Sequence, residues 1–418
     1  MNTFSRITLD AWRQFAHVDL EFDSRLCVLT GPNGCGKTTI LNVLGRHFGW
    51  NVNFVSTPYL TSKGQRFWSD LDAVLEGMYD VNRGDQRVGT ILYENGDECA
   101  LYTPRGNQPQ YSLRYASQST VEGLNIPSHR PVASYFPIQQ IPLDPKTNQQ
   151  HFQEFQGLLM QVYGSDHVRN PGRVLKESLI ALALFGYGNQ AVASNAEYVQ
   201  LFEGFQGVLR IVLPKSLGFQ RLHVRTPEVV LVTETGEFPL DAMSGGVGAI
   251  FTVAWQIYMY GVGKQRFTVL IDEPENHLHP SMQREFLPAL TEAFPNCNFI
   301  VATHSPFIVS SAADATVYAL MYQDASDLPP TMPNRRKIIS RRLREVDLSG
   351  SANRILREVL DVPSTLPVWV ERKVSDVLAK HSAAGGGGDS AEAAYRELLE
   401  LGILKAVGNL PDADGSAP

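Results

Sequence analysis

A glycine-rich stretch near the N-terminus has the residue types and spacing that could hold phosphate groups. Residues 31–39 read Gly-Pro-Asn-Gly-Cys-Gly-Lys-Thr-Thr and match the pattern G-x-x-x-x-G-K-[ST] in full. Backbone N–H groups of such a loop turn inward on phosphates, and the following helix N-terminus adds partial positive charge. We expect Lys37 to meet the β- and γ-phosphates of a nucleotide and Thr38 to hold Mg²⁺. The candidate nucleotide-binding residues are Gly31, Pro32, Asn33, Gly34, Cys35, Gly36, Lys37, Thr38 and Thr39.

Two carboxylates follow a second buried-strand pattern far along the chain. The apolar run from Phe267 to Ile271 ends in Asp272 and Glu273. In doubly wound α/β folds the carboxyl end of such a strand lies beside the phosphate loop. Asp272 is therefore expected to bind Mg²⁺, and Glu273 to act as the general base that polarises an attacking water. The alternative is an acidic helix start without chemistry.

Two further segments complete the set of residues that could do chemistry. Asn298 to Thr303 predicts another buried strand, and His304 directly follows it, from where it can reach the γ-phosphate region. The segment Ser244–Gly246 precedes a long apolar stretch and lies 28 residues before Asp272 (272 − 244 = 28). A hydroxyl and backbone N–H groups at a helix start can meet an anion.

This ordered set of motifs resembles the ABC-type ATPase superfamily. The resemblance implies an α/β P-loop head that binds ATP and Mg²⁺, and two heads that pair face to face as a homodimer or within a higher oligomer. It implies that the signature segment, Ser244, Gly245 and Gly246, closes over ATP held by the opposite head. A glutamine loop between the phosphate loop and the signature segment is also implied. Gln139 and Gln140 are the candidates, and an ordinary solvated pair is the alternative.

Other residues narrow the resemblance to one branch of that superfamily. Asp272-Glu-Pro-Glu-Asn-His-Leu-His-Pro and the opening Trp12–Phe15 look like the soluble DNA-associated branch, which includes RecF, the overcoming-lysogenization-defect (OLD) nucleases and many anti-phage ATPases. Residues 349–360, with the helical segments after them, look like the C-terminal end of Septu- and retron-associated ATPases. The implied function is an ATPase that controls a separately encoded nuclease or other effector. The alternatives are a RecF-like DNA-clamping repair ATPase and a nucleotide-gated scaffold with little turnover.

Composition and charge exclude several classes of protein. The chain has 418 residues, of which 43% are hydrophobic and 19% charged, and this balance excludes a wholly disordered or fibrous chain. The net charge of −7 means that DNA or RNA could bind only at a local basic patch. The candidate patch is a cluster of six cationic residues: Arg335, Arg336, Lys337, Arg341, Arg342 and Arg344. The alternative is a solvated strand pair whose charges bind no nucleic acid. Four cysteines without a C-x-x-C pair indicate reduced thiols in the cytoplasm.

Hydrophobic periodicity predicts the organisation of the chain. Strands are expected over the first 30 residues and in a hairpin around Asn95-Gly96, and helices over residues 149–213. The uncharged stretch after Asp241 contains five glycines and predicts a buried helix rather than a membrane span. In a C-terminal helical hairpin, Val370, Val374 and Val377 are expected to share one apolar face, and Ala394, Leu398 and Leu401 another.

The fold class that follows is an α/β P-loop ABC-type ATPase head with a helical insertion and a C-terminal helical appendage. We expect the N-terminal part of the head at residues 1–125, an irregular segment and the helical insertion at 126–215, and the C-terminal part of the head at 216–325. A basic segment and helical hairpin are expected at 326–408, and a disordered tail at 409–418.

Overall fold

The computed structural model of this chain divides into two compact units. One comprises Met1–Ile355 and Val359–Asp361, and the other Leu356–Glu358 and Val362–Pro418. The structure describes residues 2–60, 66–69, 85–104, 108–130, 135, 137–138, 141, 146–162, 170–311, 314–323, 337–344, 352–360, 362, 364–383, 388–401 and 403.

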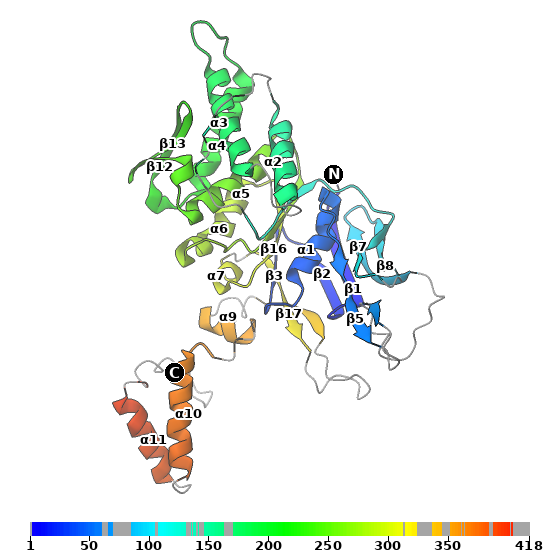
Figure 1. Cartoon of the computed structure of the whole chain (residues 1–418), viewed down its shortest axis with the longest axis vertical. Coiled ribbons are helices and arrows are strands. Elements are labelled where there is room, and N and C mark those ends of the chain that lie inside the picture. The colour runs from blue at the N-terminus through cyan, green and yellow to red at the C-terminus, as the bar shows by residue number, and fades with distance from the viewer. Residues whose placement is uncertain are drawn as a thin grey trace. The chain divides into compact units, whose positions relative to one another are not determined.

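A mixed sheet of eleven strands forms the centre of the first unit (Figure 1). In their order across the sheet the strands are β10 (Arg114–Ala116), β8 (Glu98–Thr103), β7 (Gln86–Tyr93), β1 (Phe4–Trp12), β2 (Phe15–Glu21), β18 (Ile338–Arg342), β17 (Thr316–Tyr322), β3 (Leu26–Thr30), β16 (Cys297–Ala302), β15 (Phe267–Asp272) and β11 (Gly123–Ile126). Strands β7 and β8 are the antiparallel hairpin predicted around Asn95-Gly96. Smaller sheets pair β4 (Phe54–Val55) with β9 (Gln110–Tyr111), β5 (Thr57–Leu60) with β6 (Arg66–Ser69), and β12 (Phe219–Arg225) with β13 (Glu228–Thr233) and β14 (Gly236–Pro239).

Four parallel neighbours in the sheet decide where the predicted motifs meet. Strands β3, β16, β15 and β11 are parallel, and nearly all their residues are buried, as expected for strands covered on both faces. Because they run the same way, the segments that follow Thr30, Ala302 and Asp272 all leave the same edge of the sheet.

Helices cover the sheet and form the insertion predicted from sequence. The helices of the first unit are α1 (Lys37–Gly45), α2 (Asn148–Val162), α3 (Pro171–Tyr187), α4 (Ala196–Val212), α5 (Gly245–Gly261), α6 (Pro280–Ala293) and α7 (Pro306–Val309), and α9 (Ala352–Glu358) lies where the two units divide. Helices α2, α3 and α4 pack together as the helical insertion, so the predicted fold class is confirmed (Figure 1). Asn170 and Asn195 cap α3 and α4 by accepting backbone N–H bonds, which fixes where each helix begins.

Helix α5 accounts for the long uncharged stretch. Its residues Phe251 and Trp255 are fully buried, because the helix packs against α2, α3, α4 and β11. Within the described part of the chain, no helix is long and apolar enough to cross a membrane.

A buried cation ties the segment before α5 to the helical insertion. Lys176 of α3 is fully buried, and its Nζ lies 2.6 Å from carboxylate oxygens of both Asp241 and Glu228. Burial opposes the charge, but the two carboxylates outweigh it and hold the pKa of Lys176 above its ordinary value. Asp241 lies three residues before Ser244, so this ion pair connects α3 to the signature segment.

We expect Lys176→Met to destabilise the first unit strongly. The change keeps the length of the side chain but leaves two carboxylates without their cation, and breaking such a pair costs about 3 kcal/mol. Urea unfolding measures the loss. Lys215→Met, at an exposed lysine, is the control and should change the free energy of unfolding little. Equal stability of the two variants would contradict a stabilising role for Lys176.

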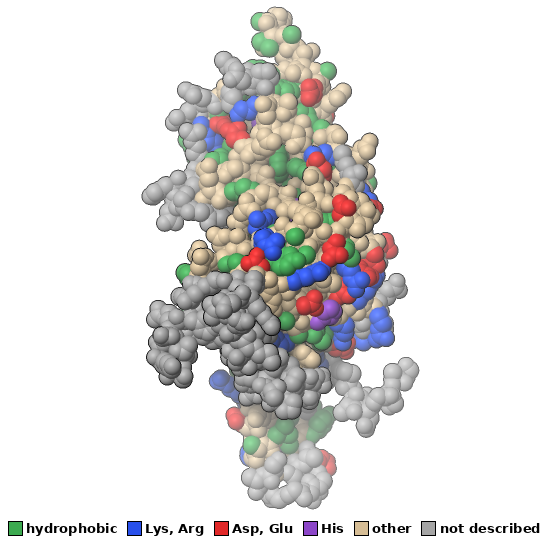
Figure 2. All heavy atoms as spheres, turned by 90° about the vertical axis from the view of Figure 1, so that its right-hand side faces the viewer, with side chains coloured by type: hydrophobic (Ala, Val, Ile, Leu, Met, Phe, Trp, Pro, Cys, Tyr) green, Lys and Arg blue, Asp and Glu red, His purple; other side chains and the backbone are tan. Residues whose placement is uncertain are grey.

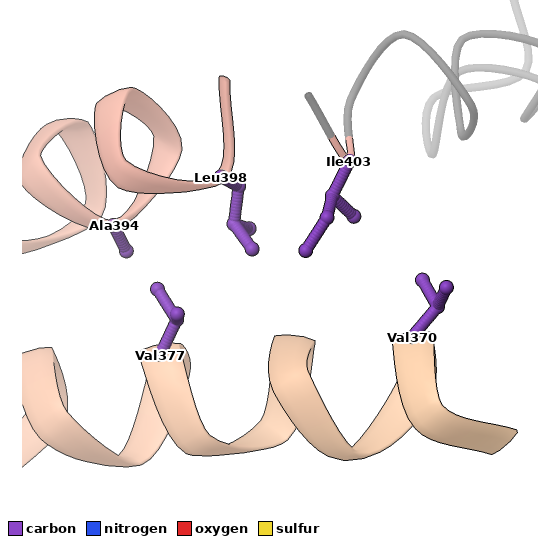
Figure 3. Packing of buried hydrophobic residues seen from close by; sticks show 5 residues of the cluster. All are labelled: Val370, Val377, Ala394, Leu398 and Ile403. Carbon is purple, nitrogen blue, oxygen red and sulfur yellow. The ribbon is translucent and has the colours of Figure 1, made fainter. Parts of the chain in front are cut away.

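The second unit is a helical hairpin with its own small core. Helices α10 (Val368–Ala383) and α11 (Gly388–Glu400) bury Val370, Val377, Ala394, Leu398 and Ile403 between them, with Val374 packed against this cluster (Figure 3). The prediction for Leu401 is wrong, because this side chain is 42% exposed. Helix α11 ends at Glu400, and the chain beyond it turns Ile403 inward instead.

Candidate functional site

The phosphate loop between β3 and α1 depends on two glycines. Gly31 has φ +141°, and a Cβ there would lie 2.3 Å from the Leu320 carbonyl oxygen. Gly36 has φ +96°, and a Cβ there would lie 2.4 Å from the Phe15 ring. Both the backbone conformation and the close neighbours therefore exclude any larger residue at these two positions.

Lys37 is held inside this loop at the first residue of α1. Its side chain is buried, and Nζ donates to the carbonyl oxygens of Gly31 at 2.8 Å and Pro32 at 3.1 Å. Cys35 lies beside it, and burial raises the pKa of the Cys35 thiol. The loop therefore presents a positive charge at the N-terminus of α1, where phosphates are favoured.

Replacing Lys37 by alanine should weaken ATP binding at least tenfold, about 1.4 kcal/mol. The change removes the positive charge and also two hydrogen bonds that hold the loop closed around it. Isothermal titration calorimetry on the folded variant measures the affinity. Lys215→Ala, at an exposed lysine outside the phosphate loop, is the control and should keep the wild-type affinity. Unchanged affinity of Lys37→Ala would rule out Lys37 as a phosphate ligand.

Thr38 and Asp272 come together from opposite ends of the sequence. The Thr38 hydroxyl donates to Asp272 Oδ2 at 2.9 Å and lies 3.2 Å from Oδ1. Burial raises the pKa of Asp272 to about 6, so a nearby cation would stabilise its charged form. A hydroxyl and a carboxylate are the oxygen ligands that Mg²⁺ prefers, and these two residues fit the predicted metal site.

Glu273 is fixed at the end of β15 in a strained conformation. Its φ is +47°, a region that non-glycine residues rarely adopt and that recurs at functional sites. The backbone N–H donates to the Ala302 carbonyl oxygen at 2.8 Å, and the Glu273 carbonyl accepts from Arg130 Nη2 at 2.7 Å. Asn276 Nδ2 donates to the carboxylate at 3.1 Å. The hydrogen bond from Asn276 therefore orients the Glu273 carboxylate, which stays partly exposed to water, as a general base requires.

His304 lies beside Glu273 at the end of the neighbouring strand. Its Nδ1 is 3.7 Å from Glu273 Oε1 and 3.3 Å from Glu275 Oε1. The structure therefore brings the candidates Lys37, Thr38, Asp272, Glu273 and His304 to one edge of the sheet. Their predicted catalytic roles stay predictions.

Residues of the turn between β1 and β2 contact the phosphate loop. Gln14 Nε2 donates to the Gly34 carbonyl oxygen at 3.4 Å, and the Phe15 ring packs against Gly36. This is the Trp12–Phe15 segment that resembled the DNA-associated branch, and it lies next to the phosphate loop.

The signature segment contacts the loop that follows Glu273. Ser244 caps α5, where its hydroxyl accepts from the Val247 N–H at 3.5 Å. A Cβ at Gly246 would lie 2.9 Å from the His277 carbonyl oxygen. The signature segment therefore packs directly against residues 273–279, the acidic loop between β15 and α6.

The candidate glutamines, Gln139 and Gln140, lie outside the described residues. The segment after β11 supplies other groups that the sequence analysis did not single out. Arg130 holds the Glu273 carbonyl, and the Ser128 carbonyl accepts from Asn276 at 3.2 Å. The sequence signal for Arg130 and Ser128 was weak, because it is the pairing of β11 with β15 that places this segment beside Glu273.

A cavity of about 510 Å³ opens next to the Thr38–Asp272 pair. One wall is the face of α1 that carries Thr38, Leu41 and Asn42, and the other is the end of β11 with Asn125 and Ser128. The two predicted Mg²⁺ ligands, Thr38 and Asp272, therefore line a cavity.

The predicted basic cluster is not a set of equivalent free cations. Lys337 is buried and donates to the Arg13 carbonyl oxygen, and Arg342 pairs with Asp23 at 2.8 Å. Arg335 and Arg336 lie outside the described residues, whereas Arg341 and Arg344 are exposed. On the face shown in Figure 2, cationic and acidic side chains are interspersed. Nucleic-acid binding by the cluster stays a prediction, and Lys337 and Arg342 have structural partners.

Family models match both halves of this site. Residues 6–52 match a family described as "AAA domain", and residues 165–310 match one described as "AAA domain, putative AbiEii toxin, Type IV TA system". The first contains the phosphate loop, and the second contains the signature segment, the Asp272–Glu273 pair and His304.

Curated relatives include a Septu protein and an OLD nuclease. The chain is 22% identical to the Septu protein PtuA of Bacillus thuringiensis over 342 residues, which is 78% of each chain. It is 26% identical to the OLD nuclease of Thermus scotoductus over 347 residues, 72% of this chain but 58% of that protein. A solved structure of an SmcHead bound to the C-winged helix domain of ScpA is also similar. The match covers 82% of this chain and 98% of the SmcHead chain, at 16% identity and a TM-score of 0.43. The predicted resemblance to Septu and OLD proteins is confirmed.

Proposed function

We propose that this chain hydrolyses ATP with Mg²⁺ and controls a separate effector in anti-phage defence. The premise is its similarity to Septu and OLD proteins and the match of both halves of the site to AAA-domain models. The observation that carries the proposal is the convergence of three strand ends. Lys37 and Thr38 follow β3, Asp272 and Glu273 end β15, and His304 follows β16.

Each of these side chains has a distinct task in the proposed reaction. The phosphate loop and Lys37 bind the β- and γ-phosphates, and Thr38 with Asp272 would hold the Mg²⁺ that neutralises phosphate charge. Glu273 accepts a proton from the attacking water and aligns it with the γ-phosphorus. His304 lies beside Glu273 and contacts the γ-phosphate as it separates.

Dimerisation on ATP would bring the signature segment of one head to the phosphate loop of the other. We propose that Ser244 of each head closes over the nucleotide of the other. The contact between Gly246 and His277 would then link the closing of one site to the acidic loop of the other, because it joins the signature segment and the acidic loop within a head. Closure would thus depend on the nucleotide state and would set the release or activation of a separately encoded nuclease or another effector. The proposed place of action is the cytoplasm.

The test is phage plating on cells that express the chain together with its neighbouring reading frame. Lys37→Ala should lower protection strongly, because it weakens nucleotide binding and removes the charge that meets the phosphates. Glu273→Gln should also abolish it if turnover is needed. Protection by Glu273→Gln at the wild-type level would favour the nucleotide-gated scaffold instead. ATP-dependent loading on gapped DNA without any effector would favour the RecF-like clamp.

A further inference from the structure

We infer that Glu275 is the positioning residue for His304 in the proposed ATPase reaction. The inference rests on the proposed function and extends it to a residue outside the nucleotide and metal sites described above. Glu275 acts through the imidazole and backbone of His304, which it holds at the end of β16.

Three groups from the end of β16 converge on one carboxylate oxygen of Glu275. The Thr303 hydroxyl and the His304 backbone N–H each donate to Oε1 at 2.8 Å. His304 Nδ1 lies 3.3 Å from the same oxygen. A carboxylate can accept several hydrogen bonds at once, which no neutral side chain of this size does as strongly.

Burial makes this arrangement rigid. The Glu275 side chain is only 6% exposed, whereas that of His304 is 43% exposed. The exposed ring is therefore held by a carboxylate that is itself fixed between β15 and β16. Among the described residues, the second oxygen, Oε2, has no hydrogen-bond partner, so the hydrogen bonds that Glu275 accepts come from Thr303 and His304.

The direction of the imidazole follows from these contacts. Nδ1 faces the carboxylate oxygens of Glu275 and Glu273, at 3.3 and 3.7 Å. Two carboxylates on this side of the ring favour a proton on Nδ1, which leaves Nε2 for another partner. Nε2, across the ring from these carboxylates, is therefore the nitrogen that can meet the γ-phosphate.

A purely structural role for Glu275 would anchor the backbone of β16 and nothing more. Two variants separate these roles. Glu275→Gln keeps an oxygen that can accept from Thr303 and His304, so the anchor stays while the charge facing Nδ1 is lost. Thr303→Val removes the bond from the Thr303 hydroxyl to Glu275 and the bond that this hydroxyl accepts from the Ser305 N–H, but it leaves the carboxylate facing the imidazole.

A double-mutant cycle on the full-length chain tests the inference. Steady-state ATPase assays should show that Glu275→Gln lowers kcat about tenfold and changes KM less than about twofold. In the His304→Ala background the same change should alter kcat less than about twofold, because its effect passes through the imidazole. Thr303→Val should keep kcat near the wild-type value.

Equal losses from Glu275→Gln in both backgrounds, or no loss in the wild-type background, would overturn the inference. Single-turnover measurements extend the cycle if His304→Ala is slow. If the wild-type chain with Mg²⁺ hydrolyses no ATP, the proposed function itself fails. Wild-type turnover with an additive cycle overturns only the role of Glu275.

Discussion

Glu273→Gln should lower ATP turnover by about 10²–10⁴-fold while ATP stays bound. Glutamine has the shape of glutamate but does not accept a proton from water at neutral pH. Its amide oxygen can still accept the hydrogen bond from Asn276, and the backbone bonds to Ala302 and Arg130 do not involve the side chain. The strained loop should therefore keep its conformation, and Lys37, Thr38 and Asp272 should still bind the nucleotide.

Two measurements separate loss of chemistry from loss of binding. Phosphate release should fall, whereas the affinity for ATP measured by calorimetry should stay within about threefold of the wild-type value. Light scattering after gel filtration should show a dimer with Mg²⁺ and ATP, because ATP that is not hydrolysed would keep the two heads closed. Glu285→Gln, at an exposed position on α6, is the matched control and should behave as the wild type. Near-normal turnover by Glu273→Gln would remove Glu273 from the base role.

Mixing two inactive variants should restore ATP hydrolysis if Ser244 acts on the opposite head. Ser244→Arg places a long charged side chain where the signature segment would close over phosphates, and Lys37→Ala removes the loop charge. Each homodimer should be inactive. A mixed dimer has one site with both defects and one intact site, so random pairing should return about a quarter of the wild-type activity if the sites act independently.

The outcome depends on which head supplies Ser244. If Ser244 acted on the ATP of its own head, every site in the mixture would carry one defect and no activity would return. Ser244→Ala is the milder companion variant, because it removes the hydroxyl and the cap of α5 without adding bulk. A chain that remains monomeric with Mg²⁺, ATP and Glu273→Gln would exclude the trans arrangement.

Some elements were predictable because their signals are local. The helix and buried-strand patterns around Gly31–Thr38, and the hairpin at Asn95-Gly96, depend on neighbouring residues in the chain. The C-terminal hairpin was predicted from the same periodicity, and it failed at Leu401, where α11 ends and the period no longer applies. An element boundary depends on capping and on the turn beyond it, which periodicity does not contain.

Charge clusters were less informative than motifs. Six cations within ten residues looked like one surface, but Lys337 reaches a backbone carbonyl and Arg342 reaches Asp23. Residues on a strand alternate between faces, and the partners of these cations come from the turn between β1 and β2, from β2 and from the segment after β2. The sequence shows the number of charges but not the acids that neutralise them.

The sequence by itself determined the chemistry available to this protein: a phosphate loop, a carboxylate pair after a strand, a histidine after another, and a glycine-rich helix start. Those signals are contiguous, and local propensity encodes them. Only the tertiary structure decided which further groups support the reaction. Arg130 and Glu273 are 143 residues apart, and Thr38 and Asp272 are 234 apart. Such pairs depend on the order β3-β16-β15-β11, which the burial of whole strands against each other fixes and no single segment contains.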